Sequence, residues 1–345
     1  MAFFSKLFRE KKKTESVILI DVAGDSVAGA YAYYKECEIP TVLYTRRFPI
    51  EIRTSEPRES AMLRALLILG EELIREGAPI LMRATGKGSA NTILVSVDTP
   101  WQETKVRMES FERKDPFIFT KSIVNNVMEK TSSVPTDKSI ADASIIGTIL
   151  NGYETHNPYG KKINRAALVI LTSFIDKNIS ESIISALRGL FHTKHILPIA
   201  GNSLRYQAMH IAFPHERGAL ILDMTGPLIS IALIRKGLFV ALVEVPQISG
   251  DNTWINVVTD ELSKLSKQYP LPRIIFLLAR ESEIPSLMQI LNTANLGSFW
   301  LSDNPPRIVP VLASHIVGSV RQVTSAPPDL QLLLMALYYF QAREK

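Results

Sequence analysis

The sequence predicts an α/β protein with a duplicated fold, in which two similar halves each begin with a three-stranded antiparallel sheet and the first half carries a small inserted domain. Short β-branched and aromatic segments, separated by Gly, Asp and Pro, predict the first sheet at residues 17–22, 27–34 and 40–48. A second set of the same character begins about two hundred residues later, at residues 218–223, 227–234 and 237–245. Each set is followed by alternating helical and strand patterns, which indicates an α/β architecture.

The residue at the end of the first strand is the clearest sign of duplication. Asp21 ends the first strand of one set and Asp223 ends that of the other, and each is followed by a turn that contains a glycine, Gly24 or Gly226. A pattern that recurs at so long a period indicates an internal repeat. We therefore expect two copies of one supersecondary unit, whose Asp-containing turns face each other across a cleft.

Between the two sheets, the pattern predicts helices, strands and an insertion. Apolar residues at helical spacing predict a helix over residues 59–76 that ends at Gly77, and a strand follows at 92–97. The insertion has the order strand, helix, strand, strand, at residues 104–111, 119–131, 141–153 and 165–173. The first half then closes with a helix, a strand and a helix, at residues 179–191, 195–200 and 203–213.

The second half continues with helices and strands in alternation, at residues 252–268, 273–278, 284–292, 307–311 and 328–342. The short connection before the strand at 273–278 leaves no room for a further subdomain there. The expected domains are a tail (1–16), a first subdomain (17–97 and 176–214) interrupted by the insertion (98–175), and a second subdomain (215–345).

Charge and cysteine content exclude several classes of protein. The net charge is +5, and the first thirteen residues contribute five basic residues against one acidic residue, so the rest of the chain is nearly neutral. No broad basic face for duplex DNA is expected, and we expect no nucleic-acid partner. A single cysteine, Cys37, excludes an internal disulfide and a zinc site built on several cysteines. With no export signal after the basic residues, a cytoplasmic protein is expected.

Two apolar segments bear on membrane attachment. The apolar run at 330–340 is shorter than the roughly 18 residues that a membrane span needs, so we expect a buried helix there. In a helix over the first residues, Phe4, Leu7 and Phe8 would share one face, so residues 1–13 could lie on an anionic membrane surface. The alternative is a frayed tail without such a role.

The two Asp-containing turns are the candidate ligand site. Backbone N–H groups in a tight glycine turn can bind an anion, and a carboxylate at each strand end can position a divalent cation with its waters. The candidate phosphate-loop residues are Asp21, Gly24, Ser26, Asp223, Thr225 and Gly226, with Asp21 and Asp223 as the magnesium residues. The alternative is that each Asp only bonds its own turn, two residues further on.

Three features of the sequence resemble the actin-like ATPase superfamily, and within it the FtsA/PilM-like proteins. They are the two Asp-containing hairpins, the insertion at 98–175, and the segment NGYETHNPYGKKI at 151–163. The resemblance covers nearly the whole chain. It implies a ribonuclease H-like (actin-like ATPase) fold, and a site in which ATP and Mg²⁺ are bound.

The same loops depart from the pattern of that family. Ala23 and Thr225 stand where the family has glycine, Pro227 has no N–H to donate, and Ala279-Arg280 replaces a glycine pair on the adenosine side. The small subdomain that closes the adenine pocket has no counterpart in this sequence. We therefore expect a non-hydrolysing or weakly nucleotide-binding scaffold that has no catalytic residues and requires no cofactor.

The resemblance also implies a partner. PilM-like proteins use a groove beside the insertion to bind the cytoplasmic tail of an inner-membrane protein, and the candidate residues for such binding are Trp101, Arg107 and Phe111. A role in type IV pilus assembly at the cytoplasmic face of the inner membrane is the main hypothesis. The alternatives are an FtsA-like, ATP-binding cell-division protein and, more weakly, an unrelated hydrolase that uses Ser26. Self-association is also left open.

Overall fold

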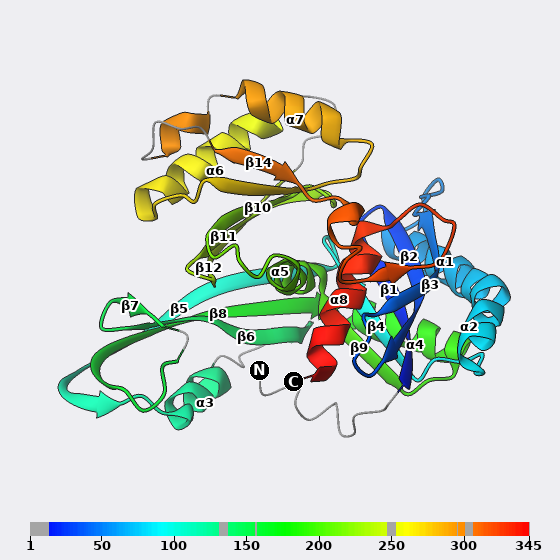
Figure 1. Ribbon diagram of the computed structural model, residues 1–345, viewed down its shortest axis with the longest axis horizontal. Helices are drawn as coiled ribbons and strands as arrows, with labels where there is room; N and C mark the ends of the chain where they lie inside the picture. The colour runs from blue at the N-terminus through cyan, green and yellow to red at the C-terminus, as the bar shows by residue number, and fades with distance from the viewer. Residues whose placement is uncertain are drawn as a thin grey trace. The chain divides into compact units, whose positions relative to one another are not determined.

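The computed structural model describes residues 14–130, 137–155, 157–246, 253–294, 296–300 and 306–344 (Figure 1). The chain forms two compact units. Unit 1 contains the described parts of residues 1–103, 174–214 and 311–345. Unit 2 contains the described parts of residues 104–173 and 215–310.

Unit 1 is built on a six-stranded sheet with the order β15-β3-β2-β1-β4-β9. Strands β1, β2 and β3 form the predicted antiparallel meander, β4 and β9 extend it in parallel, and β15 pairs with β3 in parallel. Their bounds are β1 Thr14–Val22, β2 Ser26–Lys35, β3 Thr41–Pro49, β4 Thr92–Val97, β9 His195–Ala200 and β15 Arg321–Gln322. Most of β1 and all of β4 are buried, because helices cover this sheet on both faces.

Two pairs of helices cover this sheet (Figure 1). Helices α1 (Arg58–Glu72) and α4 (Lys177–Phe191) pack together against it, as do α5 (Gly201–Ala212) and α8 (Leu330–Glu344). The buried helix predicted from the apolar run is α8, which is buried from Leu332 to Tyr339. The sequence pattern assigns residues 311–345 to the second half, whereas in the structure α8 packs against α5 and β1 in unit 1, where its apolar surface is covered from several sides.

The prediction that the first helix ends at Gly77 was wrong. A π-helical turn at Leu73–Gly77 follows α1, and α2 (Ala78–Thr85) continues the helical path to Gly86, which has φ 76°. Gly77 keeps helical angles, and the reason for a glycine there is space: a Cβ would lie 2.7 Å from the Tyr31 ring. The sequence alone cannot distinguish a glycine that makes room for an aromatic ring within a helix from a glycine that ends a helix.

Unit 2 repeats the topology of unit 1 in a five-stranded sheet with the order β12-β11-β10-β13-β14. An antiparallel meander of three strands is again extended by two parallel strands next to the first strand, so the structure confirms the duplicated α/β fold. The bounds are β10 Ala219–Asp223, β11 Leu228–Arg235, β12 Leu238–Pro246, β13 Ile274–Leu278 and β14 Arg307–Pro310. Helices α6 (Trp254–Gln268) and α7 (Ile284–Thr293) accompany it, and 269–273 joins α6 directly to β13. Short 3₁₀ turns cover Leu296–Phe299 in unit 2 and Ala313–His315 in unit 1.

The insertion has the predicted order of strand, helix, strand, strand, with one additional short strand. Its sheet has the order β5-β8-β6-β7. The bounds are β5 Gln102–Ile118, α3 Lys121–Lys130, β6 Lys138–Leu150, β7 Tyr153–Glu154 and β8 Lys162–Asp176. Helix α3 packs Val124 and Val127 into a core with Phe119, Leu150 and Ile163.

The segment NGYETHNPYG explains the additional strand. Asn151 and Gly152, with φ 49° and 85°, make the two-residue turn that pairs β7 with β6. The Asn151 side-chain oxygen accepts hydrogen bonds from the backbone N–H groups of Asn164 and Arg165, at 3.1 and 3.0 Å. These residues therefore have a structural role within the insertion.

Candidate functional site

The first candidate loop surrounds Asp21, near the end of β1, and its carboxylate is engaged by an arginine. Asp21 is 1% exposed. Arg47, on meander strand β3, which is separated from β1 by β2, donates from Nη2 to Asp21 Oδ2 at 3.0 Å and from Nη1 to Ser26 Oγ at 2.9 Å. Its Nε donates to Oδ2 of Asp329, which lies just before α8, at 2.7 Å. One guanidinium thus joins β1, β2, β3 and the start of α8.

The electrostatics of this cluster follow from its burial. Burial raises the pKa of Asp21 from 3.8 to about 6; Arg47 opposes this shift, and the nearby carboxylates Asp98 and Asp329 add to it. Within the described residues, Asp21 Oδ1 has no hydrogen-bond partner. Burial by itself would lower the pKa of Arg47. The attraction and hydrogen bonds of the Asp329 and Asp21 carboxylates have a larger effect, and they raise the Arg47 pKa above its usual range. Arg47 therefore stays charged, and it is the cation that faces Asp21.

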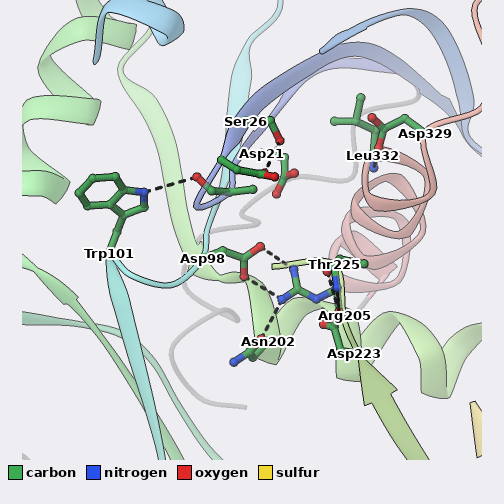
Figure 2. Close-up of polar contacts among 12 residues, drawn as sticks. Asp21, Ser26, Asp98, Trp101, Asn202, Arg205, Asp223, Thr225, Asp329 and Leu332 are labelled. Carbon is green, nitrogen blue, oxygen red and sulfur yellow. Dashed lines mark hydrogen bonds and ion pairs between the residues drawn. The ribbon is translucent and has the colours of Figure 1, made fainter. Parts of the chain in front are cut away.

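A second ion pair lies at the same edge of this sheet (Figure 2). Asp98 directly follows β4, and Arg205 on α5 donates to both of its carboxylate oxygens, at 2.7 and 2.8 Å. Arg205 Nη2 also donates to Asn202 Oδ1 at 2.7 Å. Both charged side chains are almost fully buried, with 7% and 6% of their surface exposed. The bidentate geometry satisfies two charges that would be costly to bury separately.

Sequence reasoning missed Arg47, Asp98, Arg205 and Asp329. For Asp98 the sequence does contain a signal, because Asp98 directly follows an apolar strand. Asp21 and Asp223 lie at the ends of their apolar strands in a similar way. Nothing in the local sequence distinguishes Arg47 or Arg205 from the other arginines, because the carboxylates they bind lie 26 and 107 residues away.

The turn between β1 and β2 uses its own polar groups. The Ala23 N–H donates to the Ser26 carbonyl at 2.9 Å, and the Arg58 guanidinium donates to the Gly24 carbonyl at 2.6 Å. The Trp101 indole N–H donates to the Ala23 carbonyl at 3.4 Å (Figure 2). Ser26 Oγ donates to the side chain of the adjacent Asp25 at 3.0 Å, besides accepting from Arg47. Ser26 is thus bound to an arginine and an aspartate, and the contacts described for it include no histidine of a hydrolase.

In the second candidate loop, at the end of β10 in unit 2, polar groups of the turn again bond one another. The Thr225 N–H and hydroxyl both donate to Asp223 Oδ1, at 3.0 and 2.6 Å, and the Met224 N–H donates to the Leu278 carbonyl at 2.8 Å. Gly226 and Pro227 follow in the same turn, and Pro227 has no N–H. An aspartate that accepts from a group two residues later stabilises its own turn.

These contacts bear on whether a magnesium-bound nucleotide fits. Mg²⁺ takes oxygen ligands and keeps several waters. Here Asp21 Oδ2 accepts from a guanidinium and Asp223 Oδ1 accepts twice from Thr225. Across the part of the chain that the structure describes, no three His, Cys, Asp or Glu side chains are grouped so that they could hold a metal ion. Within its own unit, each of these carboxylates therefore already accepts hydrogen bonds from the chain.

The three candidate partner-binding residues lie in different surroundings. Trp101 is not an exposed anchor: it is 9% exposed and its indole bonds the β1–β2 turn, because a large ring with one N–H fills the space under that turn. On β5, Phe111 packs against the core of the insertion. Arg107, on the same strand, is half-buried, and its Nη1 lies 3.7 Å from Glu109 Oε1. Residues 1–13, the candidate membrane segment, lie outside the described residues, among which no helix is long and apolar enough to cross a bilayer.

Comparison with known proteins shows the fold. No family model and no curated protein matches the sequence. Among solved structures, the chain is similar to one described as a PilM-PilN type IV pilus biogenesis complex, with 12% identity, a TM-score of 0.57 and coverage of 95% of this chain and 98% of the other. A Bacteroides thetaiotaomicron protein with an actin-like ATPase fold and unknown function matches at 11% identity and a TM-score of 0.47, covering 97% of this chain and 98% of the other. The chain therefore has the actin-like ATPase fold.

Proposed function

We propose that this actin-fold protein is a PilM-like scaffold that binds a partner protein and does not hydrolyse ATP. Its place would be the cytoplasmic face of the inner membrane, in type IV pilus assembly. The similarity to the structure described as a PilM-PilN type IV pilus biogenesis complex supports this choice, because it spans almost the full length of both chains.

The observation that carries the proposal is the ion pair of Arg47 with Asp21. A metal-bound triphosphate at this turn would need the Asp21 carboxylate for the waters of the cation, yet Arg47 Nη2 lies 3.0 Å from it. Among the described residues only Asp21 Oδ1 lacks a partner, so a hydrated cation that used both carboxylate oxygens would have to displace Arg47, whose guanidinium also bonds Ser26 and Asp329. Breaking this partly buried ion pair would cost free energy, which the nucleotide would have to supply from its own binding energy.

The backbone of the turn supports the same proposal. Phosphate loops bind through free N–H groups. The Ala23 N–H already donates to Ser26, and the Thr225 N–H already donates to Asp223. A phosphate would therefore have to replace hydrogen bonds that the chain makes with itself, so it would gain little over water.

For the partner, we propose a short cytoplasmic peptide of an inner-membrane protein, bound through the insertion. Residues 1–13 would add weak attachment to anionic lipid, at about 1 kcal/mol for each basic residue near the surface. Binding of this kind needs a shaped surface rather than a reaction, so it is compatible with loops whose carboxylates are bonded by groups of the chain itself.

Calorimetric titration of the full chain with Mg·ATP tests the nucleotide part. We expect no saturable binding below the millimolar range, and the same result for Asp21→Ala. Asp25→Ala, in the same turn, is the matched control. Low-micromolar affinity that Asp21→Ala abolishes and Asp25→Ala retains would overturn the proposal and favour the ATP-binding alternative.

A labelled peptide from the cytoplasmic tail of the organism's own PilN-type protein tests the partner part. We expect binding that is the same with and without Mg·ATP, and that weakens with Arg107→Glu on β5. Lys162→Glu, an exposed change on β8 of the same sheet, should leave the affinity unchanged. Peptide binding that requires Mg·ATP would contradict the proposed role, and so would the lack of any peptide binding.

A further inference from the structure

A group of exposed apolar side chains follows the outer surface of the helical segment from α1 to α2. Leu67 and Ile68 are 43% and 44% exposed, Ile74 is 42% exposed and Met82 is 50% exposed. Single exposed apolar residues are ordinary on a protein surface, whereas several on one helix mark a surface that another molecule covers.

A hollow lies directly beside this apolar ridge, within unit 1. Helices α1 and α4 meet closely at Gly70, where a Cβ would lie 2.4 Å from the Leu190 side chain. Elsewhere they leave a hollow of about 510 Å³. Leu63 and Leu67 form its α1 side, and its α4 side is lined by small or polar residues, namely Asn178, Glu181, Ser182, Ser185 and Ala186. The same surface thus offers a protruding ridge and a recess, which a two-fold interface requires because each patch must fit itself.

The charges on α1 match such self-pairing. Positions 64, 67, 68 and 71 share one face of a helix, since they are three or four residues apart. If two α1 helices pack antiparallel about an axis between Leu67 and Ile68, Leu67 of one copy lies against Ile68 of the other. The same axis places Arg64 of each copy, which bonds Glu56 of its own chain through Nε and Nη2, opposite the exposed Glu71 of the other. Apolar contact at the centre and opposite charges on both sides are the arrangement of a specific interface.

We propose that two copies of this protein form a two-fold dimer through α1, with Leu67 and Ile68 at its centre and the hollow beside α4 receiving the second copy. A pair of helices buries less than a standard interface of about 1,600 Å², so the dimer exchanges rapidly with the monomer. This inference does not depend on the proposed scaffold role, since Leu67 and Ile68 lie on α1 away from Arg58, the residue of that helix that bonds the Asp21 loop.

Sedimentation velocity of the full chain over a series of concentrations tests the proposal. The wild type should shift from monomer to dimer as concentration rises. Leu67→Glu and Ile68→Glu should each weaken the dimer about tenfold or more, because each places two carboxylates in an apolar contact. Both positions are partly exposed, so the variants should fold, which circular dichroism verifies. Val323→Glu, at a residue of unit 1 that is 56% exposed, is the matched control and should dimerise as the wild type does.

Cross-linking gives an independent measurement. In a Cys37→Ser background, Leu67→Cys should form a disulfide-linked dimer on mild oxidation, and Val323→Cys should not. Glu71→Arg should weaken dimerisation, because the new arginine of each copy would lie opposite Arg64 of the other copy. A wild type that stays monomeric at all concentrations, or a dimer that Leu67→Glu weakens no more than Val323→Glu does, would refute the interface.

Discussion

The carboxylate of Asp98 lies so close to Gly201 that a Cβ at position 201 would stand 2.1 Å from Asp98 Oδ1. The same Cβ would lie 2.9 Å from Arg205 Nη1. Gly201 is the first residue of α5, so the start of this helix and the buried Asp98–Arg205 ion pair occupy space that no other residue type allows.

Gly201→Ala should therefore destabilise unit 1 strongly. The methyl group would displace the Asp98 carboxylate from its bidentate contact, and disturbing a buried ion pair costs roughly 3 kcal/mol or more. Urea unfolding measures the loss. Gly189→Ala on α4, where nothing lies within 4 Å of the new Cβ, should be neutral or slightly stabilising. Equal effects of the two changes would contradict the described contact.

Arg205→Met should lower the free energy of unfolding by about 3–5 kcal/mol, because it leaves the Asp98 carboxylate buried without its cation. Asp98→Asn combined with Arg205→Met should cost less than the two single changes added together. Chemical denaturation of the three variants gives this comparison. If the double variant equals the sum, the two side chains do not act as a pair.

Asp21 should make the stability depend on pH between about 4 and 6. Since burial raises its pKa from 3.8 to about 6, the folded state binds this proton more tightly than the unfolded state does. The stability that this proton contributes is at most about 3 kcal/mol. It is fully present below the pKa of Asp21 in the unfolded state, and it is lost as the pH rises through the pKa of Asp21 in the folded state. Asp21→Asn removes the titration, so the stability of the wild type relative to this variant should fall as pH rises through this range.

Urea unfolding at closely spaced pH values measures that slope, with Asp25→Asn as the control at an exposed position of the same turn. A difference between wild type and Asp21→Asn that is constant across the range would show that Asp21 does not titrate there.

Asn151→Ala should destabilise the insertion by about 1–3 kcal/mol. It removes the oxygen that accepts from the backbone N–H groups of Asn164 and Arg165, and it places alanine at φ 49°. Tyr153→Ala, beside it and 77% exposed, should leave the stability unchanged. Thermal unfolding of both variants tests whether this segment has the structural role assigned to it.

The order of the elements could be predicted because it depends on local pattern. Strand segments such as Ile274–Leu278 and helices such as Lys177–Phe191 carry their periodicity within a few residues, and the two meanders repeat it. The end of the first helix could not be predicted, because the role of Gly77 depends on Tyr31, forty-six residues earlier, and on the π-helical turn that continues the helix. Likewise, only the tertiary structure shows that α8 belongs with unit 1.

The candidate site was predictable only in part. Asp21 and Asp223 stand out because each lies at the end of an apolar strand, but their partners do not. Arg47 and Asp329 are separated by 282 residues, and no spacing in the sequence links them. The burial of Trp101 could not be predicted, because a tryptophan near basic residues has the same sequence pattern whether it is exposed or fills the space under a turn.

Hydrogen bonds link helix α8 to β1 and β2 across more than three hundred residues: the Tyr339 hydroxyl donates to Glu15 on β1, and the Tyr34 hydroxyl on β2 donates to the Ala336 carbonyl. A ribosome making this chain in order delivers every strand of unit 2 before it delivers α8. The part of the first meander that α8 covers must therefore wait, with its apolar side chains exposed, until residues 330–344 have been made. Unit 2 can fold on the ribosome, and unit 1 can only be completed after it.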